Sequence, residues 1–259
     1  MKAVFLDVDN TLTDPISHAV PESAAKAIFS ARKKGVRVFA ATGRNTLNTA
    51  EAKVIEHIEF DGYVGMNGAI CHIGKEEPFY SLPLDTRDVE AAFVMHKELD
   101  FAMQISTLYE IYLTNENEKV TEYDAVLDIA RPGLLPEGFE FKDVDVYALM
   151  PYAGEDIEAL IMPRLKNSLA VRWGGHSFDI IPKAGGKHVG IQKMMERFGL
   201  KREEVLAIGD GGNDITMLEY VGVGVAMNHA SELVKKSADF IAPKDRPIEA
   251  VFKKYGIIN

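Results

Sequence analysis

The stretch FLDVDNTLTD, residues 5–14, puts two carboxylates at the point where an apolar strand should end. The apolar run Ala3–Leu6 leads directly into Asp7, Val8 and Asp9. In an extended chain, Asp7 and Asp9 would point to the same side, roughly 6.5 to 7 Å apart along the strand. Because carboxylates are rarely buried without a partner, this spacing predicts a positive charge between them.

Apolar runs alternate with amphipathic stretches toward both ends of the chain, which is typical of strands and helices wound into a parallel sheet. We expect strands at residues 2–8, 36–41, 63–66, 205–208, 222–227 and 240–242. We expect helices at residues 22–34, 46–57 and 187–198, and a hairpin in residues 69–84 with its turn at 74–77. The pattern predicts an α/β fold with a doubly wound, Rossmann-like parallel sheet.

The middle third of the chain follows a different pattern. It reads as helix, two strands, helix, strand, helix and two strands, which is typical of an antiparallel α+β unit. Proline and glycine interrupt the periodicity near Pro83 and in PKAGGK, residues 182–187. These breaks predict a discontinuous core domain of residues 1–83 and 184–259, with an inserted cap domain of residues 84–183.

Composition excludes several classes of protein. The 259 residues are 47% hydrophobic and 26% charged, as in ordinary globular proteins. A net charge of -10 argues against nucleic acid or an anionic membrane as partner, and no apolar run approaches the roughly 18 residues of a membrane span. The apolar run at the start, Ala3–Leu6, is too short for a secretory signal. Cys71, the single cysteine, is expected to be buried and inert, in a protein of the reducing cytoplasm.

Polar residues follow several of the predicted core strands. Asp7 and Asp9 follow the first, Thr42 and Gly43 the second, and Asp210 a later one, and GDGGND at residues 209–214 adds Asp214. The carboxyl ends of parallel strands meet at one edge of the sheet, so we expect four acids to face one pocket. Such a cluster requires a cation, and oxygen ligands select Mg²⁺. Mg²⁺ in turn implies phosphate chemistry, with one aspartate left to attack phosphorus.

Four segments resemble the motifs of the haloacid-dehalogenase-like phosphatases: DVDNT at residues 7–11, ATGR at 41–44, GGKHVGI at 185–191 and GDGGND at 209–214. MNGA at residues 66–69 and the place of the insert resemble the Cof-type subgroup, whose sugar-phosphate phosphatases carry a large α/β cap. The resemblance spans essentially the whole chain. It implies a Mg²⁺-dependent phosphatase that acts on a small phosphorylated metabolite, with a sugar phosphate as the expected substrate.

The resemblance also implies a role for each motif residue. Asp7 would be the nucleophile that forms an aspartyl-phosphate, and Asp9 would protonate the leaving oxygen and then activate water. Mg²⁺ would be held by Asp7, the Asp9 carbonyl and Asp210, with Asp214 supporting it directly or through water. The transferring phosphoryl group would be bound by Thr42, Gly43, Lys187 and Asn213. Asn10 stands where glycine is common in the family, and asparagine tolerates unusual backbone angles.

For several residues, an ordinary structural role remains an alternative to the functional one. Lys187 could be a solvated residue at a helix end, and Lys183 is a rival phosphate binder in the same linker. Trp173 and His176, in the RWGGHSF segment of the cap, could select the substrate. They could equally be a tryptophan of the cap core and a solvated histidine.

Two other functions use the same aspartates. A phosphomutase would share Asp7 and Asp9 but would return the phosphoryl group instead of releasing it. A phospho-aspartate signalling protein fits poorly, because it has no use for Asp9 and because a cap would cover its phosphorylated residue. A non-catalytic sugar-phosphate binder is weaker still, since all the chemical residues are present. The proposed site draws on one chain only and needs no second subunit.

Overall fold

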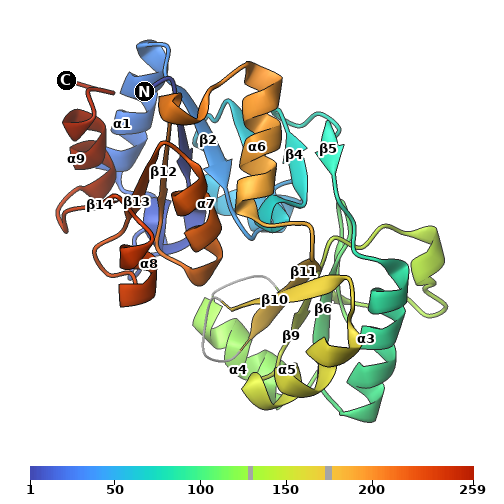
Figure 1. Ribbon diagram of the computed structural model, residues 1–259. Helices are drawn as coiled ribbons and strands as arrows, with labels where there is room; N and C mark the ends of the chain where they lie inside the picture. Colours follow the sequence, from blue (N-terminus) through green and yellow to red (C-terminus); the bar gives the residue numbers. More distant parts are fainter. Residues whose placement is uncertain (128–130, 173–176) are drawn as a thin grey trace. The chain divides into compact units, whose positions relative to one another are not determined.

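Figure 1 shows the computed structural model, which describes residues 1–127, 131–172 and 177–259. The chain forms two compact units. The first comprises residues 1–46, 52–81 and 186–259, and the second comprises residues 47–51 and 82–185. Trp173 and His176, named above as candidates for selecting the substrate, lie outside the described residues.

The first unit is built on an eight-stranded sheet in the order β14-β13-β12-β1-β2-β3-β4-β5. Its strands are β1 (Ala3–Leu6), β2 (Arg37–Ala41), β3 (Gly62–Gly65), β4 (Ile70–His72), β5 (Tyr80–Ser81), β12 (Val205–Gly209), β13 (Val223–Ala226) and β14 (Phe240–Ile241). The pairs from β14 to β3 are parallel, whereas β4 and β5 are antiparallel additions at one edge. The predicted α/β fold and the predicted hairpin are confirmed.

Helices cover both faces of this sheet (Figure 1). One face packs against α1 (Glu22–Lys33) and α9 (Pro247–Lys254), and the other against α6 (Lys187–Phe198), α7 (Ile215–Tyr220) and α8 (Glu232–Lys236). Because side chains alternate along a strand, Val4 and Leu6 join the first core while Ala3 and Phe5 join the second. All four residues of β1 are fully buried, which explains their continuous apolar run.

The predicted helix at residues 46–57 is largely wrong. A short helix, α2 (Thr49–Ala52), is followed by a 3₁₀ turn, Lys53–Ile55. Thr46 is bound through its hydroxyl to His72, and the Asn48 side chain accepts hydrogen bonds from the backbone N–H groups of Ala50 and Glu51. Side-chain bonds of this kind compete with the helix, so the chain stays irregular up to Asn48.

The second unit carries a six-stranded sheet in the order β10-β11-β9-β6-β7-β8. Its strands are β6 (Met103–Ser106), β7 (Ile111–Leu113), β8 (Gly133–Leu134), β9 (Ala148–Pro151), β10 (Ser168–Arg172) and β11 (Phe178–Pro182). Its helices are α3 (Thr86–Glu98), α4 (Glu118–Leu127) and α5 (Glu155–Ile161). All pairs are antiparallel except β7 with β8, and the predicted order of helices and strands is confirmed apart from the two-residue β8.

Within the described residues, no helix has both the length and the apolar character that crossing a bilayer would require. Cys71 is buried between β3 and β5, and burial raises the pKa of its thiol to about 12. The prediction that Cys71 is buried is confirmed, and a raised pKa disfavours the thiolate, which is the reactive form.

Candidate active site

Asp7 lies at the carboxyl end of the central strand β1. Its backbone N–H donates to the carbonyl of Ile208 over 2.9 Å, which continues the pairing of β1 with β12 by one residue. The sheet register therefore places Asp7 beside Gly209, the last residue of β12, and Asp210 follows directly after it. The Asp7 residue is only 5% exposed, so its charge needs partners close by.

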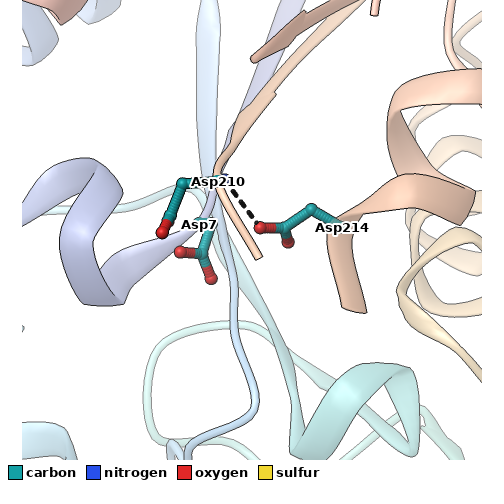
Figure 2. A group of neighbouring side chains, drawn as sticks. All are labelled: Asp7, Asp210 and Asp214. Carbon is teal, nitrogen blue, oxygen red and sulfur yellow. Dashed lines mark hydrogen bonds between the residues drawn. The ribbon is translucent and has the colours of Figure 1, made fainter. Parts of the chain in front are cut away.

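Three carboxylates meet at this edge of the sheet (Figure 2). One oxygen each of Asp7, Asp210 and Asp214 lies within 4.8 Å of the others. Asp214 is held by the N–H groups of Asp210 and Gly211, which donate to its Oδ2 over 2.9 and 2.8 Å, and the first of these bonds is drawn in Figure 2. Asp210 accepts a hydrogen bond of 2.7 Å from the hydroxyl of Thr11. The acidic group, meaning Asp7, Asp210 and Asp214, is thus fixed by the two segments that follow β1 and β12.

Lys187 is the cation of the acidic group. It is the first residue of α6, its side chain is fully buried, and its Nζ lies 2.6 Å from Oδ1 of both Asp7 and Asp214. Burial acts to lower the pKa of this lysine, but Asp214 and Asp7 outweigh burial, so the pKa is raised and Lys187 is charged. The plain alternative of a solvated helix-end lysine is therefore wrong.

One lysine does not balance three carboxylates, of which Asp7 and Asp214 are buried and Asp210 is half-buried. Burial, followed by the charge of Asp214, raises the pKa of Asp7 well above its ordinary value, with Lys187 acting in the opposite direction. Burial also raises the pKa of Asp210, although its bond from Thr11 opposes this. A cation among the three would favour their charged forms. The donors are all carboxylate oxygens, so the acidic group fits a hard divalent cation such as Mg²⁺.

The Asp9 carboxylate is not one of the three that gather within 4.8 Å of one another. It forms a two-pronged ion pair with Arg44, with Nε–Oδ2 and Nη2–Oδ1 distances of 2.8 and 2.7 Å. Strand geometry does not continue to Asp9, because β1 ends at Leu6 and residues 8–12 form a turn in which Asp9 and Asn10 have non-helical backbone angles. Asn10 has a φ of +60° in this turn, a value that glycine and asparagine tolerate best.

The predicted phosphate-binding residues follow β2 and β12, apart from Lys187, which begins α6. Thr42 follows β2 and is fully buried, and its hydroxyl oxygen accepts from the backbone N–H of Arg44 over 3.1 Å. Gly43 comes next and is half-buried. Asn213 follows Asp210 and donates its Nδ2 hydrogen to Oδ1 of Asn67 over 2.9 Å. Lys183, the rival phosphate binder, belongs to the second unit.

Two contact residues were not assigned a role from the sequence. Arg44 was quoted within ATGR and Asn67 within MNGA, and the structure ties them to Asp9 and Asn213. The available signal was chemical, since a lone arginine beside a predicted acidic pocket needs a carboxylate partner. Nothing local to the sequence indicates which carboxylate that is.

Comparison with known proteins identifies the family. Residues 4–254 match the sequence profile of the haloacid dehalogenase-like hydrolases. The chain belongs to this family. A solved structure of a HAD subclass IIB sugar phosphatase is 30% identical in sequence, and the two chains cover 100% of each other with a TM-score of 0.90. The predictions of a haloacid dehalogenase-like fold and of a phosphatase are therefore confirmed.

Curated relatives include proteins that carry phosphatase in their names. YkrA of Bacillus subtilis strain 168, named as a candidate phosphatase, is 26% identical over 266 residues, covering 100% of this chain and 99% of the relative. A Streptococcus pyogenes protein, named as a candidate bifunctional phosphatase and peptidyl-prolyl cis-trans isomerase, is 26% identical over 246 residues. That match covers 94% of this chain but only 51% of the longer relative.

Proposed function

We propose that this protein is a Mg²⁺-dependent phosphomonoesterase that hydrolyses a small phosphorylated metabolite, with sugar phosphates as the substrate class. The observation that carries the proposal is the acidic group at the carboxyl end of β1, with buried Lys187 bonded to two of its three carboxylates. A set of three carboxylates and one ammonium withdrawn from water contributes little to the stability of a fold. The same set can bind a metal ion and a phosphoryl group. Similarity to a sugar phosphatase over the whole chain supports the substrate class.

The first chemical step is assigned to Asp7. A carboxylate oxygen of Asp7 attacks phosphorus, an aspartyl-phosphate bond forms, and the bond from phosphorus to the substrate oxygen breaks. Asp9 gives a proton to the leaving oxygen, so that the product departs as an alcohol. The resulting Asp9 carboxylate matches the anion that Arg44 holds in this structure.

The second step returns Asp7 to its starting state. A water molecule attacks phosphorus, Asp9 takes one of its protons, and the bond from phosphorus to Asp7 breaks to release inorganic phosphate. Mg²⁺, when held by Asp7, Asp210 and the Asp9 carbonyl with support from Asp214, supplies positive charge next to the phosphoryl oxygens. Lys187 and the donors Thr42, Gly43 and Asn213 bind the remaining phosphoryl charge, which is spread over three oxygens in a loose transition state.

Residues 84–183 are proposed as the cap of the enzyme, following the boundaries expected from Pro83 and PKAGGK. The second unit has a hydrophobic core of its own, which includes Leu84, Phe101, Leu149 and Phe178. A cap with its own core can carry variable loops without disturbing the acidic group. We therefore assign substrate choice to loops of this unit.

The function is tested by incubating the purified protein with a panel of sugar phosphates and measuring inorganic phosphate. Release is expected with Mg²⁺ and without any added bisphosphate, and chelation should stop it. Asp7→Asn should lose activity by at least about 10⁴-fold, because the attacking oxygen is gone. A requirement for a bisphosphate activator, with isomerised sugar phosphate as product, would instead identify a phosphomutase. Full turnover in a protein freed of metal would refute the proposed site.

A further inference from the structure

The turn Met66–Gly68, between β3 and β4, has an unusual backbone. Its three residues have φ values of +47°, +53° and +90°. Only Gly68 is a glycine, and the other two are almost completely buried, at 1% and 2% exposure. Side chains disfavour the left-handed region, so three such residues in succession persist only where the surroundings hold them. Strained backbone of this kind clusters at functional sites.

Hydrogen bonds tie this turn to the loop that follows β2. The N–H of Asn67 donates to the carbonyl of Thr42 and the N–H of Met66 to the carbonyl of Arg44, each over 3.0 Å. The carbonyl of Thr42 and the N–H of Gly43 belong to one planar peptide group and point in opposite directions. A bond that fixes the Thr42 carbonyl therefore also fixes the direction in which Gly43 presents its N–H to a phosphoryl oxygen.

The same turn reaches the loop that follows β12. Oδ1 of Asn67 accepts a hydrogen bond of 2.9 Å from Nδ2 of Asn213. A side-chain amide has two hydrogens on its nitrogen. Fixing one of them on Asn67 orients the other, which Asn213 can donate to the phosphoryl group.

Close backbone packing joins the turn to the start of α6. A side chain on Gly68 would place its Cβ 2.2 Å from the carbonyl oxygen of Gly186 and 3.2 Å from Cα of Lys187. A Cβ on Gly190, one turn into α6, would lie 2.9 Å from Cα of Gly68. The turn thus lies directly against the backbone that carries Lys187.

We propose that Asn67 is a positioning residue for phosphoryl binding, acting through the Thr42–Gly43 peptide and the amide of Asn213. The proposal rests on the proposed function, because it assigns phosphate binding to those three residues. Asn67 belongs to a turn that contacts the Thr42, Lys187 and Asn213 loops together. Its side chain contributes the bond to Asn213, and its backbone contributes the bond to Thr42.

The side-chain part is tested with Asn67→Gly, because glycine accepts a φ of +53° without strain and keeps the backbone N–H. The affinity for inorganic phosphate, measured as its inhibition constant, should weaken about tenfold, as expected for one lost hydrogen bond to a group that binds an anion. The value of kcat/KM should fall by a similar factor for a sugar phosphate and for p-nitrophenyl phosphate, since both present the same phosphoryl group. The matched control is His18→Gly, at an exposed residue with the same φ of +53°, which should leave both quantities unchanged.

A double-mutant cycle separates positioning from general damage. If Asn67 acts through Asn213, then Asn67→Gly combined with Asn213→Ala should bind phosphate no more weakly than Asn213→Ala alone. Asn67→Asp, which keeps an acceptor oxygen and tolerates the left-handed region, is the second variant. In that background Asn213→Ala should still weaken phosphate binding, so the proposal can be tested even if Asn67→Gly folds poorly.

Two outcomes overturn the inference. Phosphate affinity in Asn67→Gly within about twofold of the wild type, while Asn213→Ala weakens it, would show that the side chain of Asn67 does not position Asn213. Strict additivity in the cycle would show the same. A wild-type protein that neither releases nor binds inorganic phosphate would instead overturn the proposed function itself.

Discussion

Arg44 binds the Asp9 carboxylate through two hydrogen bonds, and this contact leads to a prediction about single-residue substitutions. If Asp9 gives a proton to the leaving group, an Asp9 side chain that is no longer held in place should lower the rate most for substrates with poor leaving groups. Arg44→Ala should therefore lower kcat for a sugar phosphate by about tenfold to a hundredfold, a part of the ~10² to 10⁴ that acid-base help provides. Formation of the aspartyl-phosphate from p-nitrophenyl phosphate should change little, because nitrophenolate departs without a proton. Rapid-mixing measurement of the nitrophenolate burst and of sugar-phosphate turnover checks this.

Two further variants sharpen the comparison. Arg44→Lys keeps the charge but not the planar, two-pronged geometry, so its activity should lie between Arg44→Ala and the wild type. Arg32→Ala is the matched control, because Arg32 is another half-buried arginine that binds an aspartate, Asp61, at an Nε–Oδ2 distance of 3.1 Å. Arg32→Ala should lower the stability of the protein but leave the ratio of its activities on the two substrates unchanged. If Arg44→Ala slowed the nitrophenolate burst by the same factor as sugar-phosphate turnover, a role for Arg44 in orienting Asp9 would be contradicted.

The residues of the acidic group could be proposed from the sequence because each follows an apolar strand or lies on a glycine-rich turn. The rule that parallel strands end at one edge then brings Asp7, Asp210 and Asp214 together. The pairing of Arg44 with Asp9 could not be foreseen, because it depends on where β1 stops and on the positive φ of Asn10. The contact between Asn67 and Asn213 joins residues 146 positions apart in the sequence, and no local pattern indicates it.

Helix α6 positions Lys187 by lying unusually close to β3 and to the turn Met66–Gly68. A Cβ at Gly190 would lie 2.4 Å from Cγ1 of Val64 and 2.9 Å from the backbone of Gly68. Alanine favours a helix by up to about 1 kcal/mol over glycine, but overpacking costs about 1 to 3 kcal/mol, and a backbone atom cannot move aside as a side-chain tip can. We expect Gly190→Ala to lower the free energy of unfolding by about 1 to 2 kcal/mol and to reduce phosphatase activity, as measured by denaturant titration and phosphate release.

The control for this substitution is Gly133→Ala. Gly133 lies in β8, a side chain there would meet no atom within 4 Å, and its φ is not positive. This change should stay within about 0.5 kcal/mol of the wild type, as exposed substitutions usually do. If Gly190→Ala proved as stable and as active as Gly133→Ala, the close approach of α6 would not be what positions Lys187.

At the level of elements, long periodic segments were predicted well and short ones were not. Helix α1 was expected at residues 22–34 and runs over Glu22–Lys33, and α6 was expected and found at residues 187–198. The short helices α7, α8 and α9 were missed, because six, five and eight residues complete too few turns for a clear helical period. The helix expected at residues 46–57 is largely absent because polar side chains at its start form hydrogen bonds outside a helix. The periodicity of the sequence does not reveal such contacts.

On the scale of the whole molecule, the chain has two units with separate hydrophobic cores, and the acidic group belongs to the first. A cation that binds the folded first unit but not the unfolded chain must stabilise it by mass action. At Mg²⁺ concentrations about 100 times the dissociation constant, the gain should be about 2.7 kcal/mol. Thermal unfolding with and without Mg²⁺ checks the gain. Asp210→Asn should reduce it, because one oxygen ligand loses its charge.

Hydrogen exchange shows where that gain is located. If the two units open independently, Mg²⁺ should slow the exchange of amides in β1 and β12 and leave those of β6 and β9 unchanged. Asp61→Asn is the control, since Asp61 lies in the first unit and binds Arg32. Asp61→Asn should lower the stability of the protein but leave the stabilisation by Mg²⁺ unchanged. Equal slowing in all four strands would mean that the two units unfold as one cooperative body. If exchange slowed in none of the strands, the acidic group would not be the site that binds Mg²⁺. Independent opening is expected here because each sheet is closed by helices of its own unit, so the core of one can be lost without exposing the core of the other.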